Sequence, residues 1–308
     1  MNEDFRLLMI SAMYENGGNT THRLLDGHPG LFVYPFESQL GTALVRDPLR
    51  SMFPVKYRWP VFPLDGDSMD DYRAIIDEEC KVRARTPRVS KFRHMPFDFS
   101  DDERAERFCW HVAAAGRTRA NNVAAFFRST FEAWRNRRAS GRESVYVGYS
   151  PIVAVDSGQI LADFPKGHVL HVVRNPWSAY ADHKKRPVPL SLDRYLLAWC
   201  LVQHLALQFR VRFPGRVHIL RFEDILASPV RALGPVCRAV GVGVAASLRT
   251  PTWNGRRLKE VYPWGTIRRA SPAANRATAV ELDAGEREAV RVRAQPYLAI
   301  LGYSRFIK

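Results

Sequence analysis

The chain has 308 residues, of which 46% are hydrophobic and 25% are charged. These are the values of a globular protein with a sizeable core, and no internal repeat or low-complexity segment interrupts them. Lysine and arginine number 46 against 31 aspartates and glutamates, a net charge of +15. Such an excess favours anionic ligands such as nucleotides, nucleic acid, acidic glycans or lipid headgroups, although a generally arginine-rich composition would give the same charge.

The four cysteines, Cys80, Cys109, Cys200 and Cys237, lie far apart in the chain. They show no CxxC or Cys/His spacing, so we expect no metal site and a reducing compartment. The segment MNEDFRLL has no basic region followed by an apolar core, and no apolar run approaches the roughly 18 residues of a membrane helix. We therefore expect a cytoplasmic protein without stable membrane insertion.

The first 40 residues predict a strand, a turn, a helix and a second strand. Phe5 to Ala12 is a short apolar run, and Glu15 to Asn19 supplies two glycines and two asparagines where a tight turn would fall. A helical pattern starts at Thr20 and stops around Gly27 to Pro29, and Leu31 to Tyr34 has the character of the next strand. This order is that of a βαβ unit.

The turn of this unit opens a helix, so its backbone N–H groups and the helix dipole form an anion site suited to phosphate or sulfate. The lysine of the nucleotide-triphosphatase loop GxxxxGK[ST] is absent, because Asn19, Thr20 and Thr21 follow Gly18. An ordinary βα turn without a ligand is the alternative at this point.

The segment after Glu37 is irregular. Ser38 to Pro63 is rich in prolines that exclude long helices, so we expect a loop or lid there. A basic linker is expected at Arg83–Met95. Helices are expected at Asp65–Val82, Asp101–Ala115, Asn121–Arg138, Leu190–Phe213 and Pro229–Val240, and further strands at Ser144–Tyr149, Val169–Val173 and Val217–Arg221.

Strands separated by helices predict a parallel sheet with helices on both faces, an α/β fold. Ligands of such sheets bind outside the carboxyl ends of the strands. The polar residues expected to gather on that edge are Glu15 to Thr21, Glu37, Ser150, Arg174 and Glu223.

Four segments, in this order, resemble the sulfotransferases that use 3′-phosphoadenosine 5′-phosphosulfate (PAPS), in particular bacterial and carbohydrate-type members. They are the first βα loop with LLDGHP, the segment YSPIVAVDSGQILADFPKGHVLHVVRNPWSAYADHKKR, RFEDILASP, and the closing YLAILGY. The resemblance covers nearly the whole chain and implies a P-loop-like three-layer α/β/α fold with a central parallel sheet. We expect a single domain over residues 1–308, with a substrate-covering insertion at about 38–140.

The resemblance is strongest at FPKGHVLHVVRNPWSAY, where it implies that Arg174 binds the 3′-phosphate of the cofactor. A salt bridge of Arg174 with Glu223 or Asp224 is the alternative. The family's serine beyond this arginine is replaced by Asp182, so Ser178, one helical turn earlier, is assigned to the cofactor instead.

The first loop departs from the family, which usually has Arg or Lys, Ser, Gly, Thr, Thr there. Alignment on LLDGHP puts Glu15 in the place of the basic residue. We assign the cofactor's contacts in this loop to Gly17, Gly18, Asn19, Thr20 and Thr21. The missing cation must come from elsewhere, and its candidates are Lys184, Lys185, Arg186, Arg256, Arg257, Arg268 and Arg269.

Arg256 and Arg257 lie in the stretch that takes the place of the family's C-terminal loop, so they are also assigned to the cofactor. Trp177, Tyr180 and Trp264 are candidates for stacking on adenine, with a place in the core as the alternative.

Sulfuryl transfer parallels phosphoryl transfer, and the acceptor hydroxyl needs a base within hydrogen-bond reach. Glu37 lies just past the second strand, where the resemblance places a catalytic glutamate; a structural acid paired with Arg46 or Arg50 is the alternative. The other candidate bases are His22, expected to face the groove or solvent, His28, expected to cap the Gly-His-Pro turn, and His183, expected to be solvated.

The sequence thus predicts a PAPS-dependent sulfotransferase acting on a hydroxyl of a sugar, glycolipid or secondary metabolite, without a metal or a nucleic-acid partner. Two alternatives are a degenerate member that binds nucleotide without turnover and a nucleotide kinase-like phosphotransferase. The sequence sets no oligomeric state.

Overall fold

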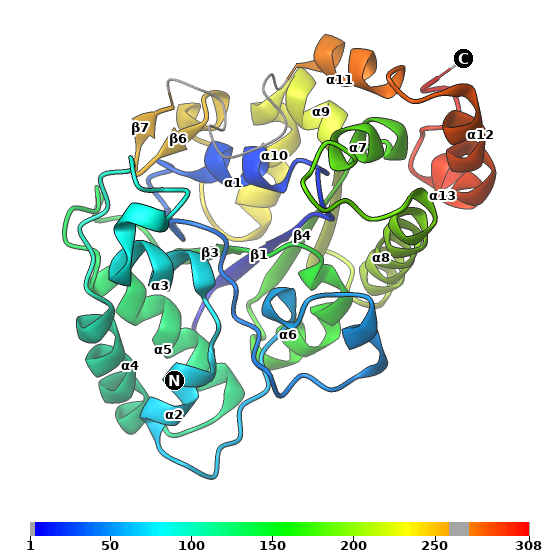
Figure 1. The fold of residues 1–308 in the computed structure, drawn as a ribbon. Coiled ribbons are helices and arrows are strands. Elements are labelled where there is room, and N and C mark those ends of the chain that lie inside the picture. Colours follow the sequence, from blue (N-terminus) through cyan, green and yellow to red (C-terminus); the bar gives the residue numbers. More distant parts are fainter. Residues whose placement is uncertain (1–3, 259–270, 308) are drawn as a thin grey trace.

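Five parallel strands form the central sheet, in the order β2-β3-β1-β4-β5 (Figure 1). The structure, a computed structural model, describes residues 4–258 and 271–307. The strands are β1 (Leu7–Ser11), β2 (Leu31–Val33), β3 (Val145–Tyr149), β4 (His168–Val173) and β5 (Val217–Arg221). All five coincide with the runs predicted from the sequence. The central strand β1 is buried along its whole length, as expected for a parallel strand covered on both faces.

Helices cover both faces of the sheet, which gives three layers. One face packs against α1 (Gly18–Leu25), α9 (Phe222–Ala227) and α10 (Pro229–Ala239). The other packs against α5 (Arg119–Glu132), α6 (Ser157–Asp163) and the later turns of α8 (Leu192–Arg212). The aromatic face predicted for residues 121–138 is confirmed as core, because Phe126, Phe127 and Phe131 are buried under the sheet. The predicted α/β/α architecture is therefore the one observed.

The remaining elements lie around the sheet and its covering helices (Figure 1). Between β2 and β3 lie α2 (Ser68–Ala74), α3 (Glu78–Arg85) and α4 (Asp101–Ala115), preceded by single 3-10 turns at Pro48–Ser51 and Val55–Tyr57. Beyond β4 lie α7 (Pro176–His183), a short hairpin of β6 (Thr252–Trp253) and β7 (Arg256–Arg257), and the C-terminal helices α11 (Pro272–Ala279), α12 (Ala284–Arg293) and α13 (Gln295–Ile300). The irregular course predicted for residues 38–63 is confirmed.

The continuous helix predicted over residues 65–82 is wrong, because the chain breaks between α2 and α3. Asp77 takes a left-handed backbone conformation with φ 34°. Its carboxylate is fully buried and forms an ion pair with Arg104 of α4 at 2.6 Å. This long-range pair overrides the local helix propensity, and α3 then runs to Arg85, into the predicted linker.

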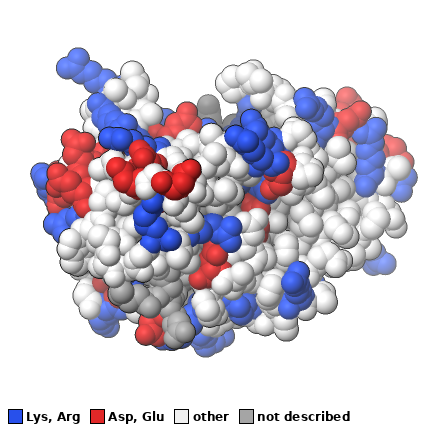
Figure 2. All heavy atoms as spheres, turned by 90° about the horizontal axis from the view of Figure 1, so that it is seen from below, with Lys and Arg blue, Asp and Glu red and all other residues white. Residues whose placement is uncertain are grey.

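The excess positive charge is not gathered in one field on the face shown in Figure 2. Lysine and arginine side chains lie there beside aspartates and glutamates. Ion pairs such as Lys184–Glu286, Arg119–Asp163 and Arg137–Glu143 illustrate the same mixing of charges. Within residues 4–258 and 271–307, no helix combines the length and the apolar character needed to cross a membrane.

Candidate active site

The glycine turn between β1 and α1 is enclosed by two aromatic rings. Gly17 has φ +90°, and a Cβ on it would lie 2.2 Å from the ring of Phe222, which follows β5. A Cβ on Gly18 would lie 2.4 Å from the ring of Tyr149, at the end of β3. Only glycine at both positions lets the turn approach these rings so closely.

The start of α1 presents unbonded backbone donors. Among the described residues, the N–H groups of Gly18, Asn19 and Thr20 have no hydrogen-bond acceptor, as is usual for a first helical turn. The Thr21 hydroxyl donates to the Gly17 carbonyl at 3.0 Å and so braces the turn. Unbonded N–H groups at the positive end of a helix dipole form an anion site.

Arg174 lies directly after β4 and is only 1% exposed. Its Nε donates to Asn275 Oδ1 at 2.6 Å, and its Nη1 donates to the Glu15 carbonyl at 3.0 Å and to Asp182 Oδ2 at 2.8 Å. Its ion-pair partner is thus Asp182, rather than Glu223 or Asp224. The second terminal nitrogen, Nη2, has no hydrogen-bond partner among the residues that the structure describes. One edge of the guanidinium can therefore bond a ligand.

Asn16 joins the glycine turn to Arg174, and the sequence analysis did not single it out. Its Oδ1 accepts from the backbone N–H of Arg174 at 2.9 Å and from Trp199 Nε1 at 3.3 Å. Its Nδ2 donates to the Tyr195 hydroxyl at 3.2 Å. A buried asparagine that bonds two strand ends fixes their spacing, and its only signal in the sequence is its place beside two glycines.

Glu223 lies at the strand-to-helix turn after β5 and bonds three neighbouring side chains. It accepts from the side chains of Asn175 at 2.8 Å, Asn275 at 2.9 Å and Tyr303 at 2.6 Å. Ser178 belongs to the same network, because its hydroxyl donates to the Asn275 carbonyl at 2.6 Å. In the structure, then, the Ser178 hydroxyl fastens α11 against α7.

Glu37 lies on the irregular segment that follows β2, with its carboxylate partly buried. Its backbone N–H donates to Glu79 Oε2 at 3.0 Å, and Gln39 Nε2 lies 3.4 Å from Glu37 Oε2. Burial and the neighbouring carboxylate of Glu79 raise the pKa of Glu37 to about 7, against the opposing charges of Lys91 and Lys56. A carboxylate of this pKa accepts a proton far more readily than an ordinary glutamate. A pairing of Glu37 with Arg46 or Arg50 is not present in the structure of the described residues.

Tyr149 connects Glu37 to the glycine turn. Its ring abuts Gly18, and burial, followed by the charge of Glu37, raises the pKa of its hydroxyl. The charge of Glu37 also raises the pKa of Tyr14, in the loop after β1, though less than burial does. Glu37 and the glycine turn therefore share one electrostatic environment at the carboxyl edge of the sheet.

A hollow of about 340 Å³ is formed by the segment between β2 and β3. Glu37 is not among its lining residues, but Glu79 and Gln39, which contact Glu37, both line it. Its apolar side carries Tyr57, Val82, Val89 and Phe92. Its polar side carries two ion pairs, Lys56–Glu78 and Lys91–Glu79. This volume is that of a site for a small organic molecule.

The three candidate histidines are less suited than Glu37 to act as the general base. His22 is 1% exposed, so the prediction that it faces the groove or solvent is wrong; burial and the charge of Arg23 lower its pKa well below the usual value. His183 is 2% exposed rather than solvated, and burial lowers its pKa to about 4. His28 is confirmed as a turn residue, since its Nδ1 accepts from the Gly30 N–H at 3.0 Å.

The remaining candidates for the cofactor lie in three places. Arg256 and Arg257 are exposed on β7, whose partner strand is anchored where the Thr252 hydroxyl donates to Asp26, the C-terminal cap of α1. Neither arginine pairs with a carboxylate among the described residues. Trp177 and Tyr180 are buried in the core beside α8. Arg268, Arg269 and Trp264 lie outside the described residues.

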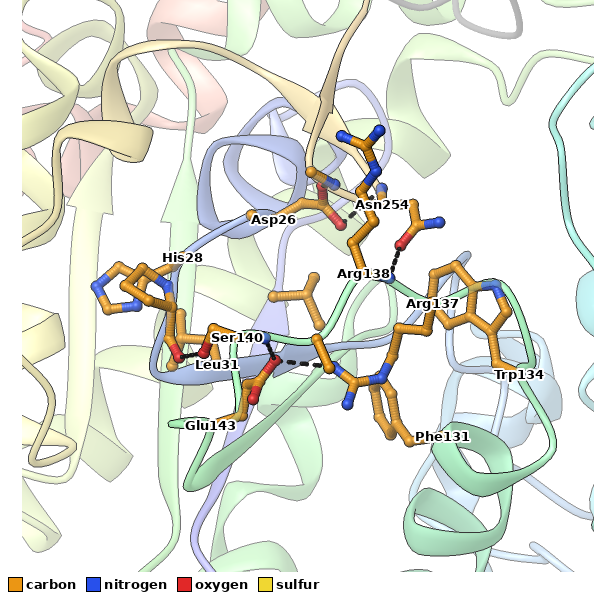
Figure 3. A pocket seen from close by; sticks show the side chains of 15 residues that line it. Asp26, His28, Leu31, Phe131, Trp134, Arg137, Arg138, Ser140, Glu143 and Asn254 are labelled. Atoms are coloured by element: carbon orange, nitrogen blue, oxygen red, sulfur yellow. Dashed lines mark hydrogen bonds and ion pairs between the residues drawn. The ribbon is translucent and has the colours of Figure 1, made fainter.

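A second hollow, of about 230 Å³, lies at the opposite end of α1 from the glycine turn (Figure 3). Arg137 points across it to the Glu143 carboxylate, which also accepts from the Ser140 backbone N–H. Asp26 is bonded to the hairpin residues Asn254 and Gly255. In this hollow, Arg137 and Glu143 are thus paired with each other, and Asp26 is bonded to backbone groups of the hairpin.

No cluster of three or more histidines, cysteines, aspartates or glutamates able to hold a metal ion is present in residues 4–258 and 271–307. The structure therefore supplies a helix start, a buried arginine and a carboxylate of raised pKa at one sheet edge. Such a site can bind an anionic group and remove a proton from a neighbouring molecule.

Solved structures of the same fold carry the same architecture. The sulfotransferase domain from the olefin synthase of Synechococcus PCC 7002 superposes with a TM-score of 0.56 at 16% identity, covering 96% of this chain and 95% of that one. The sulfotransferase domain from the curacin biosynthetic pathway also gives a TM-score of 0.56, at 12% identity, covering 96% of this chain and 99% of that one. No curated protein matches the chain significantly in sequence. Residues 41–246 match the profile of the Sulfotransferase family, more than half of the chain, and the protein therefore belongs to this family.

Proposed function

We propose that the chain transfers the sulfuryl group of PAPS to a hydroxyl of a small-molecule or glycan acceptor, with Glu37 as the general base. The observation that carries this proposal is that Tyr149, whose ring lies against the unbonded start of α1, also lies in the field of Glu37, whose pKa is raised to about 7. The base and the anion site are the two groups that such a transfer requires.

The residues present fit a nucleotide with phosphate groups at both ends. The N–H groups of Gly18, Asn19 and Thr20 suit a terminal phosphosulfate, and the free Nη2 of Arg174 suits a 3′-phosphate. Asn16 bonds the Arg174 backbone at 2.9 Å, so the two anion sites are held at a fixed separation. Arg256 and Arg257 are unpaired among the described residues and remain our proposal for further contacts with this phosphate. The Ser178 hydroxyl would have to leave the Asn275 carbonyl to join them.

PAPS supplies an activated sulfuryl group when it is bound. Glu37 takes the proton of the acceptor hydroxyl while the acceptor oxygen forms a bond to sulfur, and the bond from sulfur to the 5′-phosphate oxygen breaks. The products are a sulfate ester and adenosine 3′,5′-bisphosphate, so atoms and charge balance. Positioning by the turn and by Arg174 accounts for most of the acceleration, as in phosphoryl transfer.

The acceptor is proposed to occupy the hollow of about 340 Å³ that Glu79 and Gln39 line. All of its lining residues come from the segment between β2 and β3, which agrees with the expected substrate-covering insertion at about 38–140. The apolar wall of Tyr57 and Phe92 would hold the body of the acceptor while a hydroxyl reaches Glu37.

The proposal is tested by incubating the protein with PAPS and a panel of hydroxylated acceptors, and by measuring the release of adenosine 3′,5′-bisphosphate. Glu37→Gln should lower kcat by about 10²- to 10⁴-fold, the usual contribution of a general base, while the Kd for the bisphosphate stays within about twofold. Glu106→Gln, an exposed change on α4, is the matched control and should keep full activity.

Retained turnover in Glu37→Gln would remove Glu37 as the base. Tight binding of the bisphosphate by the wild-type protein, with no sulfate transfer to any acceptor of the panel, would instead favour the degenerate, nucleotide-binding alternative. Binding of ATP with magnesium in preference to the bisphosphate would contradict the choice of nucleotide.

A further inference from the structure

Glu15 stands in the glycine turn and binds two arginines with different atoms. Its backbone carbonyl accepts from Arg174 Nη1 at 3.0 Å. Its carboxylate lies 3.2 Å from Nε of Arg186, with 11% of the Glu15 side chain exposed. The negative charge of Glu15 would repel an anion at the start of α1, and the positive charge of Arg186 offsets that repulsion.

Arg186 reaches the turn from the loop that follows α7. Its backbone N–H donates to the His183 carbonyl at 3.0 Å, and its guanidinium carbon lies 5.4 Å from the centre of the Tyr14 ring. The side chain is 41% exposed, against 1% for Arg174. Arg186 thus lies on the open side of the turn, where a ligand can reach it.

The two basic neighbours of Arg186 are directed elsewhere. Lys184 pairs with Glu286 of α12 at 2.8 Å, and Lys185 pairs with Asp182 at 3.0 Å and with Glu281 at 2.7 Å. Of the three consecutive basic residues after α7, Arg186 is therefore the one that faces the glycine turn.

The charge of Arg186 also reaches the residues around Glu37. Burial raises the pKa of Tyr14 to about 12, and the charge of Arg186 opposes that rise. The same charge acts on Tyr57, which lines the hollow proposed for the acceptor. The guanidinium therefore acts on two tyrosines whose pKa values the charge of Glu37 also affects.

We propose that Arg186 supplies the cation of the donor-binding turn, bonding the 5′-phosphosulfate end of the nucleotide, and that Glu15 is the residue that positions it. This inference rests on the proposed function, since it assumes PAPS as the donor. Arg186 is paired through Nε, and a guanidinium carries five N–H donors, so its terminal nitrogens can bond the ligand while the pair with Glu15 persists. Arg186, which lies outside the turn, thereby provides the positive charge that the turn's own residues lack.

The experiment compares two nucleotides that differ at the 5′ end. Adenosine 3′,5′-bisphosphate and adenosine 3′-monophosphate are titrated by calorimetry into the wild-type protein and Arg186→Ala. Arg186→Ala should weaken the bisphosphate by about 10- to 100-fold, the range for a charge-assisted hydrogen bond, and leave the monophosphate within about twofold. Arg210→Ala, an exposed change on α8, is the control and should alter neither affinity.

If Arg186 had only a structural role, a cation placed at another position would not restore the affinity for the bisphosphate. Glu15→Lys in the Arg186→Ala background returns a cation to the turn itself. Glu15 already has a positive φ of 60°, so exchanging glutamate for lysine adds no new backbone strain. This double variant should recover most of the lost bisphosphate affinity. Glu15→Gln with Arg186→Ala should bind more tightly than Arg186→Ala alone, because it removes a negative charge beside the anion site.

The inference is overturned by unchanged bisphosphate affinity in Arg186→Ala, by equal losses for both nucleotides, or by no recovery with Glu15→Lys. Arg186→Lys keeps the charge without the planar fork; an affinity between those of the wild type and the alanine variant is expected, and an affinity as low as alanine's would contradict a role of the charge. A protein that binds the bisphosphate through Arg186 yet transfers no sulfate refutes the proposed function and leaves this inference standing.

Discussion

The backbone N–H of Glu37 donates to the carboxylate of Glu79 at 3.0 Å, which holds two acidic side chains against each other at the edge of the sheet. Glu37 follows β2, and Glu79 lies in the first turn of α3. The Glu79 carboxylate is in turn paired with Lys91. Burial, and after it the Glu79 carboxylate on α3, therefore raise the pKa of the residue that we propose as catalytic base.

The first prediction concerns the pH dependence of transfer. Glu37 must be deprotonated to accept a proton, and its pKa is raised to about 7, so kcat/KM should rise with pH up to about 7 and then level. Glu79→Gln removes the neighbouring negative charge but keeps an oxygen that can accept the Glu37 N–H. The acidic limb of the profile should therefore move to lower pH, toward the ordinary range of a glutamate.

The pH–rate profile of Glu106→Gln serves as the control and should coincide with that of the wild type. Lys91 and Lys56 lower the pKa of Glu37, so Lys91→Met should move the acidic limb the opposite way, to higher pH. If the acidic limb stays at the same pH in both Glu79→Gln and Lys91→Met, the pH dependence of the rate is due to the titration of a group other than Glu37.

The second prediction is a pH-dependent stability of Glu37→Gln. The folded-state pKa of Glu37, about 7, lies above its ordinary value of 4.5, so the folded state holds a proton that the unfolded state releases between these values. Stability that this group contributes is present at low pH and is lost as pH rises through about 7. Glutamine does not titrate, so the free energy of unfolding of Glu37→Gln relative to wild type should increase between pH 4.5 and 7, by on the order of 1–3 kcal/mol. Urea unfolding at pH 5 and pH 8 measures it, and a difference independent of pH would contradict the assignment of the raised pKa.

The sheet could be predicted from the sequence because its signals are local. Each strand is a short apolar run, and the buried strand β4 ends at Arg174, where the resemblance to the family is strongest. The glycine turn was also predicted. In the structure, the rings of Phe222 and Tyr149 leave no space for a Cβ at Gly17 or Gly18. Glu37 was selected by its place just past β2 together with the resemblance to the family, and it lies outside the range of residues 41–246 that matches the family profile.

The partners of the site residues could not be predicted, because they depend on contacts between distant segments. Nothing in the sequence near Glu15 indicates that Arg186 will lie 3.2 Å away, and Asp182 was read as a missing serine before it proved to pair with Arg174. The burial of His22 and His183 was missed for the same reason: each lies on a helix whose covering elements come from elsewhere in the chain. Local patterns give the elements, whereas charge pairing and burial follow from their assembly.

The third prediction tests the close approach at the glycine turn. Gly18 has an ordinary backbone conformation, so alanine is disfavoured there by contact alone: its Cβ would lie 2.4 Å from the Tyr149 ring. Gly18→Ala should cost about 1–3 kcal/mol of unfolding free energy, typical of overpacking, and should also weaken adenosine 3′,5′-bisphosphate. Gly243→Ala is the matched control, because no atom lies within 4 Å of its would-be Cβ, and it should be neutral or slightly stabilising. Equal stabilities of the two variants would contradict the close packing of the Tyr149 ring against Gly18.

The last prediction concerns the buried ion pair at the break between α2 and α3. Arg104 has no solvent exposure, and it bonds Asp77 at 2.6 Å, Asp101 at 2.6 Å and the Tyr72 hydroxyl at 2.7 Å. Arg104→Ala would leave the Asp77 carboxylate buried without its cation, so the free energy of unfolding should fall by about 3–5 kcal/mol, as measured by urea denaturation. Arg107→Ala, one turn away with 48% of its side chain exposed, should change it by no more than about 1 kcal/mol. Asp77 immediately precedes α3, and α3 carries Glu79, which raises the pKa of Glu37. If Arg104→Ala displaces α3, the acidic limb of its pH–rate profile should therefore also move. A loss no larger than that of Arg107→Ala would mean that the buried pair does not fix the start of α3.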